Sequence, residues 1–339
     1  MSQGPHGARA LFSLLFHGDK AIELVEAAWA TGVLAELDAG PVSVGEVAER
    51  AGLVPGRLFK LLEGLEALGV VERVHEAARF EESRYVSREP LAEAAAQTVG
   101  PESIERDRLK QPWQHLRGRL AEVLRGAEGI PPDEFAWPPQ TDEQVREFES
   151  AMATGVPPLA ESLLAQPALF EGVGRLLDVG GGDGTLAARL AEAHPALEVD
   201  VYNLPAAREL IEGRVAASPA AGRLGVVCGD FLEEPLPEGY DAISFVRVLH
   251  DWPNDVTWSL LEKARRALAP GGRLWIVEEL RTPDRLAVQL FWTYFLVGVD
   301  GCFSRLRAAE DYLGWLAELG FDEARVLRGG PFEVVAARR

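Results

Sequence analysis

Two spacings of apolar residues follow one another along this chain. Near the start, apolar side chains recur every three or four positions, as at Ile22, Val25 and Trp29, which predicts an amphipathic helix. From Arg175 onward, short apolar runs alternate with longer helical stretches. Such alternation is typical of an α/β fold, a doubly wound parallel sheet with helices on both faces.

The first hundred residues predict a small, mostly helical domain that ends in a β-hairpin. Lys20 to Asp38 has helical periodicity, and Ser43 to Glu46 is a capping-box pattern that opens a short helix. A leucine stripe from Pro55 to Gly69 predicts the next helix. Strands are expected at 70–74 and 80–86, and this order of helices and hairpin is that of a winged helix.

The middle of the chain is expected to be helical around one loop. Ala92 to Leu124 and Glu143 to Ala165 have helical character, whereas Gly126 to Thr141 is rich in proline, glycine and acids. Phe148 and Met152 are apolar positions of the later helix. They suit core packing, and lining a substrate cavity is the alternative.

The sheet half begins with a glycine-rich turn after its first strand. The expected strands are 175–179, 197–202, 224–228, 240–248, 273–278, 324–327 and 332–336, with helices at 205–215, 255–268 and 309–319. Gly180, Gly182 and Gly184 let the backbone turn tightly and approach a ligand, and the helix that follows offers free N–H groups. We therefore expect a nucleotide or nucleoside seat. The G-x-G-x-G spacing differs from the dinucleotide pattern, and the acidic Asp178 suits a positively charged ligand better than a pyrophosphate.

The charge balance bears on the possible partners. Lys and Arg total 34 against 53 for Asp and Glu, which gives a formal net charge of −19. A winged helix commonly reads DNA, so a DNA-binding regulator is a rival hypothesis, but an acidic chain argues against nucleic acid.

Two cysteines exclude a disulfide framework and fit a reducing cytoplasm, and no signal peptide or membrane-spanning run is visible.

Ligands of such sheets bind beyond the carboxyl ends of the strands, where several polar residues are predicted to lie. Asn203 ends the second strand, where a nucleoside-binding sheet usually places a carboxylate for the ribose, and its alternative role is a turn before Leu204. Asp230 follows the third strand and suits the adenine amino group, with Phe231 over a ring face. A solvated loop acid is the alternative for Asp230.

His250 follows the fourth strand and is the candidate general base. A histidine at this edge can take a proton from a substrate hydroxyl, although a structural, hydrogen-bonded histidine fits the pattern equally well. Glu278 ends the fifth strand and could fix the tautomer of the imidazole. An aromatic-rich stretch that includes Trp292 and Phe295 suits a flat substrate, and core packing or a dimer contact explains it almost as well.

Taken together, these motifs resemble a known family. The loop resembles motif I of the S-adenosylmethionine-dependent methyltransferases, and the ordered set is similar to the small-molecule O-methyltransferases of the caffeate and hydroxyindole type, including bacterial natural-product-tailoring members. The motifs are D-V-G-G-G-D-G at 178–184, N-L-P at 203–205, G-D-F at 229–231, R-V-L-H-D-W at 247–252 and L-A-P-G-G-R-L at 268–274. The resemblance covers nearly the whole chain and implies a winged-helix-like dimerisation domain at 1–100, a helical linker that lines the substrate cavity at 101–165 and a methyltransferase domain at 166–339.

The resemblance also implies a function and a set of site residues. We expect a cytoplasmic, homodimeric O-methyltransferase that methylates a hydroxyl of an aromatic or polyketide-like small molecule and binds no metal, nucleic acid or membrane. S-adenosyl-L-methionine would be held by Asp178, Gly180, Gly181, Gly182, Asn203, Leu204, Asp230, Phe231 and Arg247. The catalytic group would be His250 with Glu278 and Asp251, and the substrate residues Phe148, Met152, Trp292 and Phe295.

Two departures from the family pattern matter. The ribose-binding acid of the family is usually Asp, and this chain has Asn203. A second supporting glutamate is replaced by Leu306, which is expected to leave His250 with one orienting carboxylate. Relatives of this fold that keep the cofactor without transferring its methyl group, such as hydroxylases and rearrangement enzymes, are the main alternative.

Overall fold

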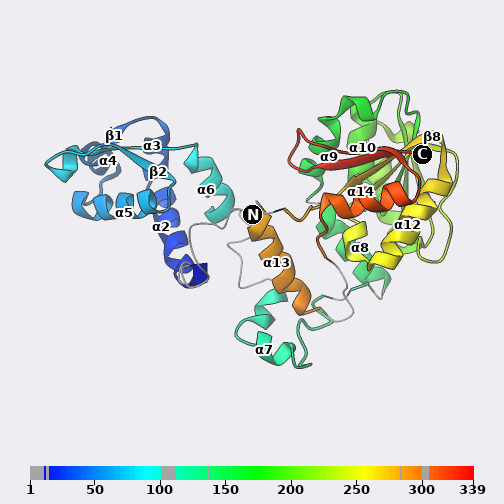
Figure 1. Cartoon of the computed structure of the whole chain (residues 1–339), viewed down its shortest axis with the longest axis horizontal. Helices are drawn as coiled ribbons and strands as arrows, with labels where there is room; N and C mark the ends of the chain where they lie inside the picture. Colours follow the sequence, from blue (N-terminus) through cyan, green and yellow to red (C-terminus); the bar gives the residue numbers. More distant parts are fainter. Residues whose placement is uncertain are drawn as a thin grey trace. The chain divides into compact units, whose positions relative to one another are not determined.

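The computed structural model describes residues 11–12, 15–100, 112–135, 137–139, 141–153, 155–282, 285–299 and 305–339, without the side chains of 112, 113, 287, 288, 291, 292 and 296. Its contacts group into two compact units, 1–114 and 115–339. Each unit is described by itself below, and Figure 1 labels the elements of both.

The first unit has the predicted winged-helix order. Its elements are α2 (Gly18–Ala30), α3 (Val33–Asp38), β1 (Val42–Ser43), α4 (Val44–Ala51), α5 (Pro55–Ala67), β2 (Val71–His75), β3 (Arg84–Ser87) and α6 (Leu91–Val99), and the sheet order is β1-β3-β2. The capping box is present, because Ser43 and Glu46 each accept the other's backbone N–H, at 3.2 and 2.8 Å. The helix predicted over 20–38 is divided into α2 and α3 at Gly32, whose φ of +77° is left-handed.

The middle of the chain is less helical than predicted before the loop. Of the described residues between α6 and residue 124, only a 3₁₀ turn at Pro112–Leu116 and the short α7 (Leu120–Val123) are helical. After the loop, α8 (Asp142–Ala153) and α9 (Val156–Leu164) occupy the predicted helical range. Within the described part of the chain, no helix has both the length and the apolar character that crossing a membrane requires.

The second unit is built on a seven-stranded sheet in the order β6-β5-β4-β7-β8-β10-β9. Its remaining elements are β4 (Arg175–Val179), α10 (Thr185–Ala193), β5 (Glu198–Asn203), α11 (Arg208–Ala217), β6 (Leu224–Cys228), β7 (Tyr240–Val246), α12 (Asn254–Ala267), β8 (Leu268–Val277), α13 (Leu286–Val297), α14 (Ala309–Glu318), β9 (Asp322–Leu327) and β10 (Val334–Arg338). The α/β prediction is confirmed, but a wholly parallel sheet is wrong. β10 runs antiparallel to both β8 and β9.

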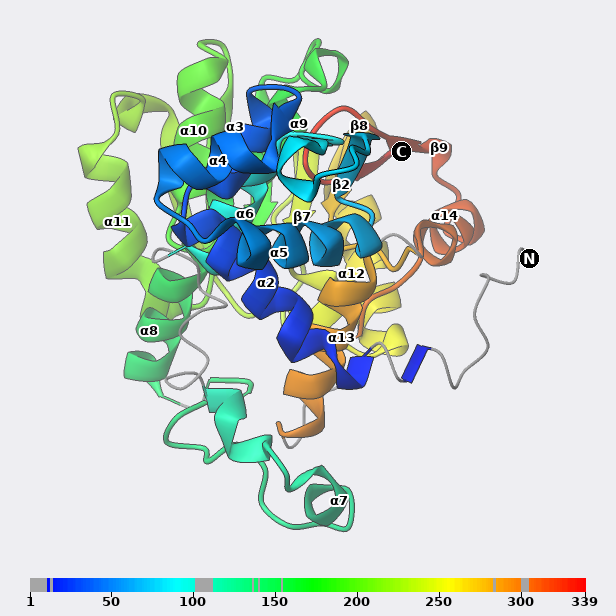
Figure 2. The ribbon, with the colours of Figure 1, turned by 90° about the vertical axis from the view of Figure 1, so that its left-hand side faces the viewer.

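Side chains of successive strand residues pack on opposite faces of this sheet. In β4, Leu176 belongs to the cluster beneath α9, α10 and α11, whereas Leu177 belongs to the cluster beneath α12 and α14. Figure 2 shows α10 and α11 on one side of the strands and α12 and α14 on the other. Because both faces are covered, ligands can reach the sheet only at the ends of its strands.

Candidate active site

The carboxyl ends of the four central parallel strands lie level with one another. Val179 at the end of β4 pairs with Tyr202 of β5 and Phe245 of β7, and Val246 of β7 pairs with Val277 of β8. The residues after these strands therefore share one edge of the sheet. They include the glycine loop, Asn203, His250 and Glu278, which are far apart in the sequence.

Glycine occupies the three positions after β4 for different structural reasons. A Cβ on Gly180, whose φ is +67°, would lie 2.7 Å from Cγ2 of Val248, and one on Gly181 would lie 2.7 Å from Oδ2 of Asp178. These two positions are glycine because their surroundings leave no room. A Cβ on Gly182 (φ +62°) would lie in ordinary van der Waals contact with Oε2 of Glu149, at 3.6 Å. Gly182 is therefore the residue at which the backbone of the loop meets the side chain of Glu149.

Asp178 lies completely buried beneath this loop. Its Oδ1 accepts a hydrogen bond of 2.6 Å from the hydroxyl of Ser244, while Oδ2 has no hydrogen-bond donor among the described residues. Burial raises the pKa of Asp178 to about 6, although the bond from Ser244 lowers it. At neutral pH the loop therefore rests on a negative charge that no described cation neutralises.

A second carboxylate reaches the loop from α8. Oε1 of Glu149 accepts a hydrogen bond of 2.8 Å from Nδ2 of Asn203, which also donates to the carbonyl of Gly182 at 3.0 Å. Burial raises the pKa of Glu149 to about 7, the bond from Asn203 lowers it, and the nearby Asp183 raises it. Asp183 itself is paired with Arg214 at 2.8 Å. The sequence analysis missed Glu149, and only its place one residue after Phe148 could have drawn attention to it.

His250 is buried between two carboxylates. Its Nδ1 pairs with Oε2 of Glu278, and its Nε2 lies 3.2 Å from Oδ1 of Asp251. Glu278 is the carboxylate expected to orient the imidazole, and Asp251 places a second carboxylate next to the opposite nitrogen. Burial lowers the pKa of His250, but the charges of Asp251 and Glu278 outweigh burial and raise the pKa to about 10.

Backbone contacts hold the His250 loop on both sides. Oε1 of Glu278 accepts the N–H groups of Val248 and Leu249, at 3.1 and 2.8 Å. On the other side the buried guanidinium of Arg307 donates to the carbonyls of Leu249 and Trp252, at 2.8 and 2.6 Å. Arg307 stands beside the Leu306 position where a glutamate was expected, and it was missed because a buried arginine cannot be told from a surface one by its spacing.

Aromatic rings continue from this edge toward α8. The ring of Trp137 lies 5.1 Å from Phe148 and 6.0 Å from Trp252, and Trp252 lies 5.8 Å from Phe231. Two predicted residues, Phe148 and Phe231, are thus joined through two tryptophans that were not assigned to the site. We call these four residues the aromatic row.

The other predicted residues differ in their surroundings. Arg247 has a left-handed φ of 56° and reaches α8, where its guanidinium lies 3.9 Å from the sulfur of Met152. Asp230 uses one oxygen to accept the N–H of Leu232 at 2.8 Å. The N–H of Leu204 donates to Oδ1 of Asn203 at 2.8 Å, so the turn-forming role considered for Asn203 is present.

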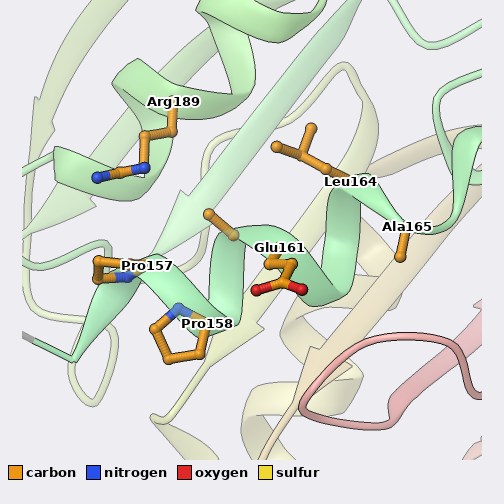
Figure 3. A pocket seen from close by; sticks show the side chains of 7 residues that line it. Pro157, Pro158, Glu161, Leu164, Ala165 and Arg189 are labelled. Carbon is orange, nitrogen blue, oxygen red and sulfur yellow. The ribbon is translucent and has the colours of Figure 1, made fainter. Parts of the chain in front are cut away.

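The remaining substrate predictions lie on α13. The ring of Phe295 packs against Phe135 at 4.9 Å, and the side chain of Trp292 lies outside the described residues. A hollow of about 540 Å³ lies between α9 and α10 and is lined by Pro157, Pro158, Glu161 and Arg189 among others (Figure 3). None of the predicted site residues lines this hollow, so we do not assign the site to it.

The strand order, the reversed β10 and the acid-preceded glycine loop define the class of seven-stranded, S-adenosylmethionine-dependent methyltransferases. Residues 108–322 match the O-methyltransferase domain family. The chain belongs to this family, and it is an S-adenosylmethionine-dependent O-methyltransferase of small molecules.

Individual relatives agree with this assignment. Demethylspheroidene O-methyltransferase of Cereibacter sphaeroides is 30% identical over 297 residues, which cover 86% of this chain and 76% of the relative. The 3-hydroxy-5-methyl-1-naphthoate 3-O-methyltransferase of Streptomyces sahachiroi is 34% identical over 168 residues, 49% of this chain and 48% of the relative. The crystal structure of the S-adenosylmethionine-dependent methyltransferase SibL in its apo form matches with a TM-score of 0.67 and 25% identity, covering 97% of this chain and 98% of that one.

The hydrogen bonds and the ion pair of Glu278 lead to a prediction about the free energy of unfolding. Glu278→Gln should lower the free energy of unfolding by about 3 kcal/mol at pH 6, because it leaves a buried imidazolium with only one of its two charged partners, Asp251. The folded-state pKa of His250 is raised to about 10, so this difference should be complete below pH 6.5 and shrink as the pH rises toward 10. Urea titrations across this pH range measure it. Glu262→Gln removes an exposed ion pair with Arg266 and should change stability by less than about 0.5 kcal/mol; equal effects of the two variants would contradict the prediction.

Asp178 should lower the free energy of unfolding at neutral pH, whereas Glu278 raises it. Because its pKa is raised from 3.8 to about 6, the folded state holds this proton more tightly than the unfolded state does. This carboxyl should therefore destabilise the wild type progressively between about pH 4 and pH 6, and Asp178→Asn should lack that contribution; both proteins keep the contribution of Glu149, whose pKa is also raised. At about 1.4 kcal/mol per pKa unit, the variant should gain about 3 kcal/mol over the wild type between pH 4 and pH 7. Urea unfolding at both pH values measures this, with the exposed Asp133→Asn as control; parallel pH profiles for wild type and Asp178→Asn would refute the assignment.

Proposed function

We propose that this enzyme methylates a hydroxyl group of an aromatic or polyketide-like small molecule, with His250 as the acceptor of the hydroxyl proton. The observation that carries the proposal is the position of His250. It lies at the carboxyl edge of the sheet, in the turn Leu249–Asp251 that follows β7, and Glu278 pairs with its Nδ1. β7 is the strand next to β4, after which the glycine loop begins. Nε2 is then the nitrogen left to exchange a proton with a substrate, once it separates from Asp251.

The residues at the sheet edge fit S-adenosylmethionine. Gly182 has no side chain, so a ligand bound beside Glu149 would come close to the backbone, and the unneutralised carboxylate of Asp178 favours a positively charged one. When bound, this cofactor supplies a methyl group that is electrophilic because it is attached to a positively charged sulfur. Gly180, Gly181 and Gly182 would hold it at the loop, and Asp178 would act on it through its charge, since its side chain is fully buried. Asn203, Leu204, Asp230, Phe231 and Arg247 would complete the seat.

The two carboxylates give His250 a basicity close to that of a phenol. The pKa of His250 is raised to about 10, and that of an unperturbed phenolic hydroxyl such as the one of tyrosine is also about 10. A proton shared between groups of matched pKa moves with little free-energy change, which favours general-base catalysis on a phenol. At neutral pH, however, the imidazole is largely protonated, so the rate should rise with pH.

The aromatic row supports a flat substrate. Trp137, Trp252 and Phe148 present ring faces and edges that bury large planar molecules well. Met152 lies one turn after Phe148 on α8 and contacts Arg247, which follows β7. The relative from Streptomyces sahachiroi is named for a naphthoate hydroxyl, which is consistent with an aromatic acceptor here.

We also propose that residues 1–100 form a dimerisation domain, that 101–165 contribute to the substrate cavity and that 166–339 form the methyltransferase domain. The large apolar side chains exposed near the start of the chain support dimerisation. Phe12 and Phe16 are 67% and 78% exposed, which is unusual for phenylalanine in a monomer.

Replacement of the proposed base tests the function directly. His250→Ala should lower kcat by about a hundredfold, because the hydroxyl proton then has no positioned acceptor, while the affinity for S-adenosylhomocysteine changes little. Product formation from a panel of phenols and naphthols and calorimetric binding measure the two effects. The exposed His75→Ala serves as control. An unchanged kcat would remove His250 from the mechanism, and no turnover with any member of the panel would contradict the proposed acceptor class.

Asp251 should set the pH dependence of the reaction. Asp251→Asn removes one of the two negative charges beside His250 and lowers the pKa of the imidazole. The pH at which the rate reaches half of its alkaline maximum should therefore be lower in the variant than in the wild type. Rates measured from pH 6 to pH 10 test this shift, with the exposed Asp255→Asn as control. Superimposable profiles of wild type and Asp251→Asn would show that Asp251 does not act on the base.

A further inference from the structure

Asn203 is not able to act as the ribose acceptor that its position suggests. Both hydrogens of its amide are used, one toward Glu149 and one toward the carbonyl of Gly182. Its Oδ1 already accepts the N–H of Leu204. An amide with both donors committed and one acceptor in use cannot hold two neighbouring hydroxyls, each of which needs an acceptor or a donor.

Glu149 has the acceptor capacity that Asn203 lacks. Its Oε1 takes the bond from Asn203, and its Oε2 accepts no hydrogen bond from a described residue and lies above Gly182, 3.6 Å from the position of a Cβ there. An ionised carboxylate accepts hydrogen bonds about twice as strongly as a neutral amide does.

We propose that Glu149 of α8 is the ribose-binding carboxylate of this enzyme and that Asn203 is a positioning residue that holds Glu149 in place. The acid that a nucleoside-binding sheet usually carries at the end of its second strand is thus supplied by a helix that precedes the sheet in the sequence. The amide of Asn203 orients the carboxylate through Oε1, which leaves Oε2 for a ribose hydroxyl. Nearby charges are consistent with this role, because Asp183 is neutralised by Arg214 whereas Glu149 has no ion-pair partner among the described residues.

The proposal rests on the cofactor seat described above, and it is tested by binding rather than by turnover. Isothermal titration with S-adenosylhomocysteine at pH 8 or above, where Glu149 with its pKa of about 7 is ionised, should show Glu149→Gln to bind at least about tenfold more weakly than the wild type, since a charged acceptor becomes a neutral one. An analogue that lacks the ribose hydroxyls should bind the wild type and Glu149→Gln equally. The exposed Glu147→Gln on the same helix should bind S-adenosylhomocysteine as the wild type does.

A second substitution provides a rescue that a purely structural role would not produce. In Glu149→Gln/Asn203→Asp the carboxylate returns to the end of β5, and most of the lost affinity for S-adenosylhomocysteine should return with it. Glu149→Asp, which withdraws the carboxylate by one methylene, should fall between the wild type and Glu149→Gln. Thermal unfolding establishes that each variant is folded.

The outcomes separate this proposal from the proposed function. If the wild type does not bind S-adenosylhomocysteine, the cofactor seat fails and the role of Glu149 fails with it. If the wild type binds and Glu149→Gln binds within about twofold of it, the seat stands and Glu149 is not the ribose acceptor. If Glu149→Gln does not fold, wild-type affinity in Glu149→Asp overturns the proposal in the same way.

Discussion

One buried carboxylate, that of Glu278, connects the sheet to the chemistry of this enzyme. It extends from the end of β8, accepts two backbone N–H groups of the loop after β7 and pairs with the imidazole of His250. The orientation of the imidazole is therefore set by the register between two neighbouring parallel strands. Arg307 holds the opposite side of the same loop, so the candidate base is fixed by the backbone around it as well as by its own contacts.

Negative charge at the glycine loop is the second organising feature. Asp178, which is fully buried, and the half-buried Glu149 of α8 have no ion-pair partner among the described residues, and the pKa values of both are raised. Positive charge and hydroxyl donors are complementary to these two carboxylates, so the loop favours a ligand such as the methyl donor.

Much of this architecture could be predicted because it is encoded locally. The glycine loop and the positions of His250 and Glu278 follow from short apolar runs and the residues that end them, and strand order brings those ends together. Glu149 could not be predicted in this way, since the rotation of α8 against the loop depends on packing between distant segments. The contact between Asp251 and Nε2 depends on side-chain torsion angles, which no periodicity reports. The reversed direction of β10 was missed because the spacing of apolar residues is the same in parallel and antiparallel strands.

The position of β10 has a consequence for how the enzyme is made. β10 lies between β8 and β9, so the strand that carries Glu278 has only one neighbour until Val334–Arg338 leave the ribosome. Until then the edge of β8, with Trp275 and Val277, is open to other nascent chains. Completion of the sheet beside the strand that leads to Glu278 thus depends on the pairing of β10 with β8.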